Sequence, residues 1–241
     1  MKVAVLSDIH GNLEAFEAVT SDIQRRGADR VVCLGDNIGY GPDPEEVVRQ
    51  IRELEYVSIL GNHEFALLDI RARRWMNFQA AENNVATAKL LSEENLAYCC
   101  TLPKYLAINY AYFVHGFPPA SLFRYLNRQP DERLAALFAT ASFSLYFLGH
   151  THKLELVRQE QEVIVRRPLG EERLELQPGE TYVINAGSVG QPRDGDNCAK
   201  YLFWDMAEAS LEVHFIPYDY RTTMEKIRAM DFPDAYAARL G

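Results

Sequence analysis

Five short clusters of histidine, aspartate and asparagine are the parts of this 241-residue chain best suited to chemistry. Each cluster follows an apolar run and has a glycine in it or beside it. Their residues are Asp8 and His10, Asp36, Asn62 and His63, His115, and His150 and His152. Imidazole and carboxylate ligands together suit manganese, iron, zinc and related ions better than calcium or magnesium. The pattern therefore predicts a site for transition-metal ions.

The order of the clusters matters more than any one of them. A lone histidine beside glycine is usually a loop residue, and Gly-Asp alone is usually a turn. Ligands of α/β sheets bind where parallel strands end, so clusters that each follow a strand gather along one edge. Asp-x-His and His-x-His are expected to place both side chains on one side of an extended segment. His214 lies within an ordinary strand pattern, and we assign it no function.

The elements that must position these clusters alternate in the first half of the chain. Apolar runs at 3–6, 30–34 and 57–60 predict strands. Between them we predict a helix that Asn12 caps and Gly27 ends, and a second helix at 44–54 with Asp43 as its cap and Pro44 at its first position. This rhythm favours parallel pairing. The later segments are predicted as a helical stretch at 64–100, a hairpin at 105–114, a helix at 130–138, a strand at 145–148, a mostly β region at 154–213 and a helical tail from 220. We predict a single domain over residues 1–241.

Composition narrows the class of protein. Apolar residues make up 48% of the chain, which is enough for a packed core, and the net charge is −9. An acidic chain without a basic stripe disfavours binding to long nucleic acids. The longest early apolar run, Val3 to Leu6, is too short for a signal peptide or a membrane span. The four cysteines, Cys33, Cys99, Cys100 and Cys198, form no CxxC pair, so we expect a reduced, cytoplasmic protein.

The clusters together resemble the calcineurin-like metallophosphoesterase superfamily. The matching motifs are Asp8-x-His10, Gly35-Asp36, Gly61-Asn62-His63-Glu64, His115-Gly116 and Gly149-His150-Thr151-His152. The segment from Asn185 to Arg193 also resembles one found in small bacterial and archaeal phosphodiesterases of this superfamily. The resemblance implies an α/β fold, a two-sheet α/β/β/α sandwich.

The resemblance also implies two divalent metal ions, with manganese expected first and iron, zinc, nickel or cobalt as alternatives. One ion would be held by Asp8, His10, Asp36 and His152, and the other by Asp36, Asn62, His115 and His150, so that Asp36 bridges them. A hydroxide between the ions would attack phosphorus in line with the leaving oxygen. His63 would be the catalytic histidine beside the metals, and Glu64 would orient it. A protonated His63 would stabilise the developing charge or protonate the leaving group.

The substrate is less well defined than the chemistry. Related protein phosphatases carry an arginine shortly after Gly-Asp, whereas Tyr40 lies near that place here, which weakens the monoester interpretation. We expect a small phosphodiester or phosphomonoester, with Asn62, Tyr40 and Arg193 as candidate contacts, although Arg193 also fits an ordinary surface loop. The alternatives are a hydrolase specific for a dinucleoside polyphosphate or cyclic nucleotide, and a non-catalytic interaction scaffold. The sequence leaves the native metal and the oligomeric state open.

Overall fold

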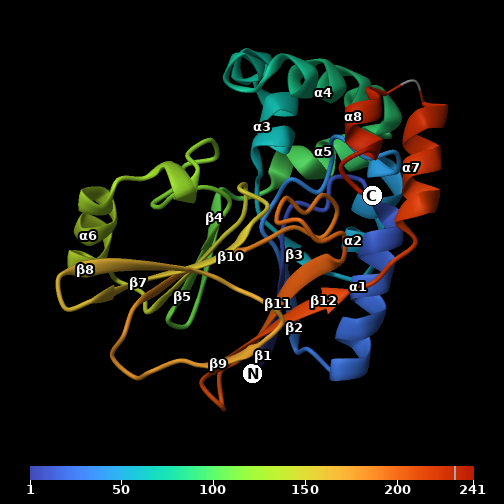
Figure 1. The fold of residues 1–241 in the computed structure, drawn as a ribbon. Coiled ribbons are helices and arrows are strands. Elements are labelled where there is room, and N and C mark those ends of the chain that lie inside the picture. The colour runs from blue at the N-terminus through green and yellow to red at the C-terminus, as the bar shows by residue number, and fades with distance from the viewer. Residues whose placement is uncertain (231) are drawn as a thin grey trace.

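A computed structural model of the chain, which describes residues 1–230 and 232–241, contains two six-stranded mixed sheets that pack face to face (Figure 1). The first sheet has the order β3 (Val57–Ser58), β2 (Arg30–Cys33), β1 (Lys2–Leu6), β11 (Ala199–Asp205), β12 (Ser210–Ile216) and β9 (Arg173–Glu175). The second has the order β4 (Tyr105–Ile108), β5 (Ala111–Val114), β6 (Leu145–Leu148), β10 (Tyr182–Ala186), β7 (Leu154–Glu160) and β8 (Val163–Pro168). Among the described residues, no helix is long and apolar enough to cross a membrane.

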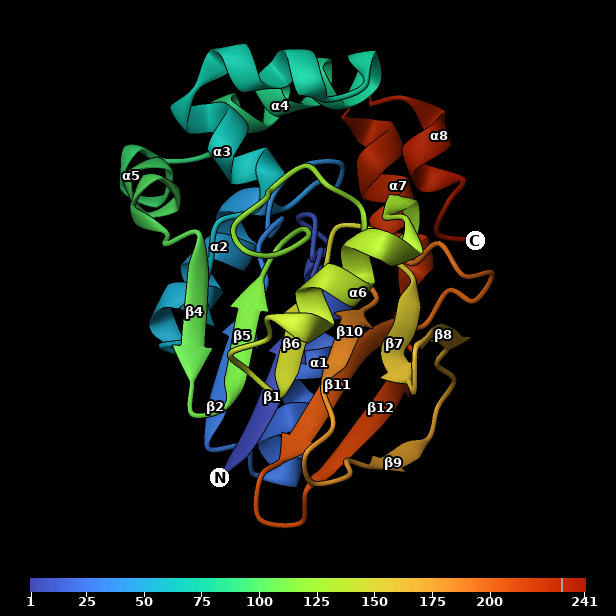
Figure 2. The same ribbon diagram turned by 90° about the vertical axis from the view of Figure 1, so that its left-hand side faces the viewer.

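Helices cover the outer face of each sheet. The first sheet is covered by α1 (Leu13–Arg26), α2 (Pro44–Glu53) and α7 (Tyr220–Ala229), and the second by α6 (Asp131–Ala139), as Figures 1 and 2 show from two sides. Side chains of β1 alternate between the two faces, so that Ala4 and Leu6 pack against Phe16 of α1 while Val3 and Val5 point between the sheets. This gives the predicted α/β/β/α sandwich.

A second group of helices lies above the strand ends that carry the polar clusters. It consists of α3 (Asn62–Leu68), the 3₁₀ helix η1 (Ile70–Trp75), α4 (Phe78–Leu90) and α5 (Glu93–Thr101). The short helix α8 (Asp234–Ala237) lies next to α4 near the C-terminus (Figure 2). A further 3₁₀ turn, η2 (Leu126–Arg128), precedes α6.

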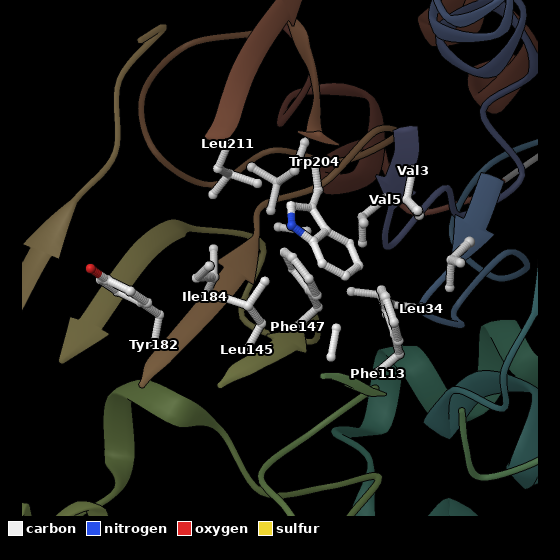
Figure 3. Packing of buried hydrophobic residues seen from close by; sticks show 14 of the residues in the cluster. Val3, Val5, Leu34, Phe113, Leu145, Phe147, Tyr182, Ile184, Trp204 and Leu211 are labelled. Carbon is white, nitrogen blue, oxygen red and sulfur yellow. The ribbon is translucent and has the colours of Figure 1, made fainter. Parts of the chain in front are cut away.

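The core between the sheets is centred on Trp204, whose side chain is fully buried. Figure 3 shows its indole between strands of both sheets, beside Phe113 and Phe147. The rings of Phe113 and Phe147 stack with centroids 5.1 Å apart, and Trp204 lies 5.7 Å from Phe147. Because protein cores pack densely, this cluster fixes the separation of the two sheets, and with it the distance between the loops that each sheet carries.

Most predicted elements are found, with three differences. Asp43 makes no side-chain cap to α2; its Oδ2 instead accepts a hydrogen bond of 2.9 Å from Lys226 Nζ. The third strand ends at Ser58 because the backbone of Leu60 turns to donate to Pro103 O, 2.7 Å away. The helical stretch is broken into separate helices, of which α4 and α5 start at side-chain caps from Asn77 and Ser92.

Candidate metal centre

The seven predicted ligands lie together at the ends of strands from both sheets. Each is no more than 6% exposed. One group brings together side-chain atoms of Asp8, His10 and His152 within 4.8 Å of one another, and a second does the same for Asp36, His115 and His150. The seventh, Asn62, places Oδ1 3.1 Å from His115 Nε2. The structure therefore gathers residues from across the chain into two adjacent groups of metal-ligand type.

The histidine tautomers of the first group favour a cation between the rings. Nδ1 of His10 lies 3.0 Å from Ile38 O, and Nδ1 of His152 lies 2.6 Å from Gln191 O. A carbonyl oxygen can only accept a hydrogen bond, so the neutral rings carry their proton on Nδ1 and leave a lone pair on Nε2. These two Nε2 atoms face each other at 3.2 Å. Two lone pairs at that distance repel each other unless a positive ion is shared between them.

The second group has the same construction. His115 Nδ1 donates to Leu34 O, 2.9 Å away, so its Nε2 is left as an acceptor. That Nε2 lies 3.2 Å from Nδ1 of His150 and 3.3 Å from Oδ2 of Asp36. The same Asp36 oxygen lies 3.9 Å from His10 Nε2 of the first group. Asp36 thus connects the two groups, as a bridging carboxylate would.

Asp8 and Asp36 each use one carboxylate oxygen for the protein and turn the other inward. Asp8 Oδ2 accepts from Ser7 Oγ at 2.6 Å and from His150 N at 2.9 Å, whereas its buried Oδ1 has no hydrogen-bond donor among the described residues. Asp36 Oδ1 accepts from His63 N at 2.8 Å. An unpartnered buried carboxylate oxygen is costly, and a bound cation would satisfy it. The residues present therefore fit a pair of divalent ions.

Electrostatics favours the protonation state that a ligand needs for Asp36 and His150, whereas it favours a proton on His115. Burial alone would raise the pKa of Asp36, but His115 and His63 hold it well below its usual range. Burial and the neighbouring His115 lower the pKa of His150 to about 3. Burial alone would lower the pKa of His115, but the neighbouring Asp36 raises it to about 9. Because the opposite charge next to His115 is what favours its proton, a metal ion in that place would displace the proton.

The loops that carry the predicted ligands are not extended, so the prediction that Asp-x-His and His-x-His lie on extended segments is wrong. Asp8, His10, Asp36, His150 and His152 all have positive φ, between 52° and 69°. For residues other than glycine this left-handed conformation costs about 1–2 kcal/mol each. The compact turns let neighbouring residues serve different groups, since His152 joins Asp8 while His150 joins Asp36. Such strain persists only where surrounding contacts impose it, and five of the ten non-glycine residues with positive φ among those described are predicted ligands.

His63 lies beside both groups and is held by contacts around its backbone. Its carbonyl accepts from Asn84 Nδ2 of α4 at 2.9 Å, and its ring lies edge-on to His10 with centroids 5.0 Å apart. Burial lowers its pKa. Gly39, with φ of +88°, passes so close that a Cβ there would lie 2.2 Å from His63 Nδ1. The sequence did not reveal either of these contacts.

The predicted role of Glu64 as the partner of His63 requires correction. Its fully buried carboxylate is used by backbone groups instead. Oε2 accepts from Asp36 N at 3.0 Å and Gly61 N at 3.1 Å, and Oε1 accepts from Asn37 N at 2.7 Å. Glu64 thus ties together the loops after β2 and β3, and its influence on chemistry passes through the position of Asp36.

The segment from Asn185 to Arg193 supports the ligand loops from behind. Asn185 Nδ2 donates to Gly149 O at 2.6 Å, and Ser188 Oγ donates to Asp8 O at 2.7 Å. Gln191 contributes the carbonyl that fixes the His152 ring. The sequence marks the segment 185–193 as a motif but does not identify three of its residues as part of the site: Asn185, Ser188 and Gln191.

A cavity of about 270 Å³ opens beside the second group. Asn62, His63 and His150 line it, together with Tyr40. Tyr40 is only 7% exposed, because His63 and the C-terminal Tyr236 pack against its ring at 4.8 and 5.0 Å. Its ring faces are therefore largely covered. The Arg193 side chain is half-buried, donates to Gln191 Oε1 at 2.8 Å, and does not line this cavity.

Comparisons with known proteins agree with the geometry. The family model described as a calcineurin-like phosphoesterase superfamily domain matches residues 1–209. An uncharacterised protein of Methanocaldococcus jannaschii, MJ0912, is 35% identical over 99% of this chain and 96% of its own length. The crystal structure of a metallophosphoesterase from Sphaerobacter thermophilus superposes with a TM-score of 0.86 and 32% identity, covering 100% of this chain and 98% of that one. The hypothetical protein PH1004 from Pyrococcus horikoshii has the same fold, with a TM-score of 0.79 at 19% identity over 99% and 97% of the two chains.

Proposed function

Because the chain belongs to the calcineurin-like phosphoesterase superfamily, we propose that it hydrolyses a small phosphodiester with the help of two divalent metal ions. The observation that carries the proposal is the pair of ligand groups that Asp36 connects, with an open cavity beside the second group. Asp8, His10, Asp36 and His152 would hold one ion, and Asp36, Asn62, His115 and His150 the other. We expect manganese, because imidazole and carboxylate donors suit it and related ions.

The bound ions would supply Lewis-acid activation of water and neutralise charge on the phosphoryl group. The chain itself contributes position and a proton. His63 lies in the cavity wall next to Asn62 and His150, within reach of a phosphate that contacts the second group. There its imidazole would stabilise the developing charge or deliver a proton to the leaving oxygen. Burial of the ligands excludes competing water from their inner side.

The charge of the cavity wall supports a diester over a monoester. A monoester carries up to two negative charges near neutral pH, and a diester carries one. Among the described residues, the wall of this cavity contains a single cationic side chain, that of Arg128. Since Tyr40 stands near the place where related protein phosphatases have an arginine, the protein wall adds little positive charge, beyond that of the two ions, for a second phosphate charge.

The proposal includes a cytoplasmic location and a soluble small-molecule substrate. The four cysteines are free in the structure, and two of them are buried. Free buried thiols favour a reducing compartment, where disulfides are rare.

The test is metal-dependent hydrolysis of bis(p-nitrophenyl) phosphate and p-nitrophenyl phosphate. Protein stripped with a chelator is reloaded with Mn²⁺, and His63→Ala is compared with His214→Ala. His214 is a matched control because it is also buried, but it packs against Tyr201 in the strand β11. We expect diester turnover to fall about 10²–10⁴-fold in the first variant only. Two bound ions per chain with no turnover of either ester would favour the interaction scaffold instead.

A further inference from the structure

We propose that the cavity beside the metal centre recognises a nucleobase, so that the substrate is a nucleotide-containing diester whose base stacks on Trp75. This inference rests on the proposed function for the position of the phosphate, and it adds the identity of the group next to it. The aromatic side chains of the cavity wall and the position of Arg128 support this inference.

Trp75 is the most informative of these side chains. It ends η1, it lines the cavity, and 74% of its surface is exposed. Trp75 also lines a second hollow of about 290 Å³, which includes Phe123 as well. An indole left this open beside a polar pocket gains free energy when a flat ring covers it. Phe123 lines both hollows and adds a second aromatic surface at the same place.

Tyr125 and Arg128, which also line the cavity, indicate where the phosphate and the base would lie. Tyr125 lies parallel to the ligand His150, with ring centroids 4.0 Å apart and an interplanar angle of 13°. The guanidinium of Arg128 covers the ring of Tyr125 at 4.9 Å from its centroid. Since His150 and Arg128 cover Tyr125, the open aromatic surface of the cavity is that of Trp75 and Phe123. Arg128 lines the cavity and makes no ion pair with a carboxylate among the described residues, so its guanidinium is available to phosphate oxygens.

The cavity also offers a hydrogen-bonding edge that a plain hydrocarbon ring would not use. Asn77 lines it, and its Oδ1 accepts from Ala80 N at the start of α4. The amide nitrogen of Asn77 remains available to an acceptor on the ring. A volume of about 270 Å³ is near the lower end for ligand pockets, which suits one nucleotide unit better than a longer chain. A nucleobase fits this wall because it is flat and heteroaromatic and because its sugar joins it to a phosphate.

Binding of adenosine 5′-monophosphate and ribose 5-phosphate provides the test, because the two ligands differ only in the base. Affinities are measured by calorimetry on Mn²⁺-loaded His63→Ala protein, so that turnover does not consume the ligand. Base–aromatic stacking predicts binding of the nucleotide at least about tenfold tighter than the sugar phosphate. Equal affinities, or no binding of either ligand, would overturn the proposal.

Variants assign the preference to its residue. Trp75→Ala should bring the two affinities within about threefold of each other, whereas Phe78→Ala should leave the ratio unchanged. Phe78 is a matched control because it is 75% exposed in the adjoining helix yet lines neither hollow. Arg128→Gln should weaken both ligands by the same factor. A preference for the nucleotide that survives Trp75→Ala would refute the role of Trp75. Since binding is measured without turnover, loss of hydrolysis in the parent protein and loss of base recognition are separate results.

Discussion

Glu64→Gln tests whether one buried carboxylate holds the metal-ligand loops in place. The two side chains have nearly the same shape, so the substitution changes charge and hydrogen bonding while leaving packing intact. The carboxylate accepts two hydrogen bonds on each oxygen, from Asp36 N and Gly61 N on Oε2 and from Asn37 N and Nδ2 on Oε1. An amide has one oxygen. Whichever oxygen becomes nitrogen, two donors lose their acceptor and face another N–H group.

The magnitude follows from these contacts. A hydrogen bond to a charged group contributes about 1.5–3 kcal/mol, so the loss of two should lower the free energy of unfolding by about 3–6 kcal/mol. The measurement is guanidinium unfolding of metal-free protein, so that altered metal affinity does not enter. We choose pH 8.5, because burial and the nearby Asp36 raise the pKa of Glu64 to about 7 and the carboxyl should be ionised there.

Two further variants keep the result interpretable. Glu225→Gln, on the exposed side of α7, should change the free energy of unfolding by less than about 0.5 kcal/mol. Glu64→Asp keeps the charge but is one methylene shorter, so it should be intermediate, and it covers the case in which the glutamine variant does not fold. A loss below about 1 kcal/mol in Glu64→Gln would refute the reasoning, because the loops would then be held without this carboxylate.

Three other predictions follow from the same geometry. Gly39→Ala should displace the ring of His63 and lower diester turnover at least about 10²-fold with both metal ions still bound. Gly27→Ala is the control: its φ is +69° and an added Cβ would meet no atom within 4 Å, so it should only reduce stability. Chelation should lower the melting temperature by roughly 16–32 °C if each of the two ions is present at about 1,000 times its dissociation constant, because each then contributes about 4 kcal/mol. An unchanged melting temperature after verified metal removal would contradict the inference that ions lie between the facing nitrogen lone pairs. Asp22→Asn should cost about 1–2 kcal/mol at pH 7, because hydrogen bonds from Tyr201 and Arg26 outweigh burial and lower the pKa of Asp22. This contribution is present above the ordinary carboxyl pKa and is lost as pH falls through the lower folded value, so the urea unfolding curves of variant and parent should converge as the pH is lowered below it.

The sequence predicts the ligands better than it predicts their surroundings. Each predicted ligand follows an apolar run that forms a strand, and the strands of both packed sheets carry their ligands at the same end of the sandwich, whatever the details of the loops. That is why Asp8, Asp36, His115 and His150 could be placed together from their spacing alone. The left-handed backbone of those loops could not be foreseen, because no local pattern distinguishes an aspartate in a strained turn from one in an ordinary turn.

The groups that support the site were harder to find for a related reason. Asn84 and Asn185 are polar residues on a helix and a strand, where their types suggest surface positions. Both are fully buried, and each donates to a backbone carbonyl distant in sequence, that of His63 in α3 or that of Gly149 in the loop after β6. Such pairs depend on tertiary structure, so composition and periodicity carry no trace of them. The position of Glu64 directly after His63 predicts a role at the site, but the sequence does not reveal its partners, because they are mainly backbone N–H groups.

The metal centre and the core between the sheets depend on each other. Asp8, Asp36 and Asn62 extend from the first sheet, whereas His115, His150 and His152 extend from the second. A change in the separation of the sheets would therefore move one half of each ligand group relative to the other. Trp204 and its neighbours set that separation in the core. The segment 185–193 begins in β10, forms most of the connection toward β11, and donates hydrogen bonds to loops of both sheets. Ions bound at this seam would in turn hold the sheets together, so their removal should loosen the contact between the sheets rather than one loop.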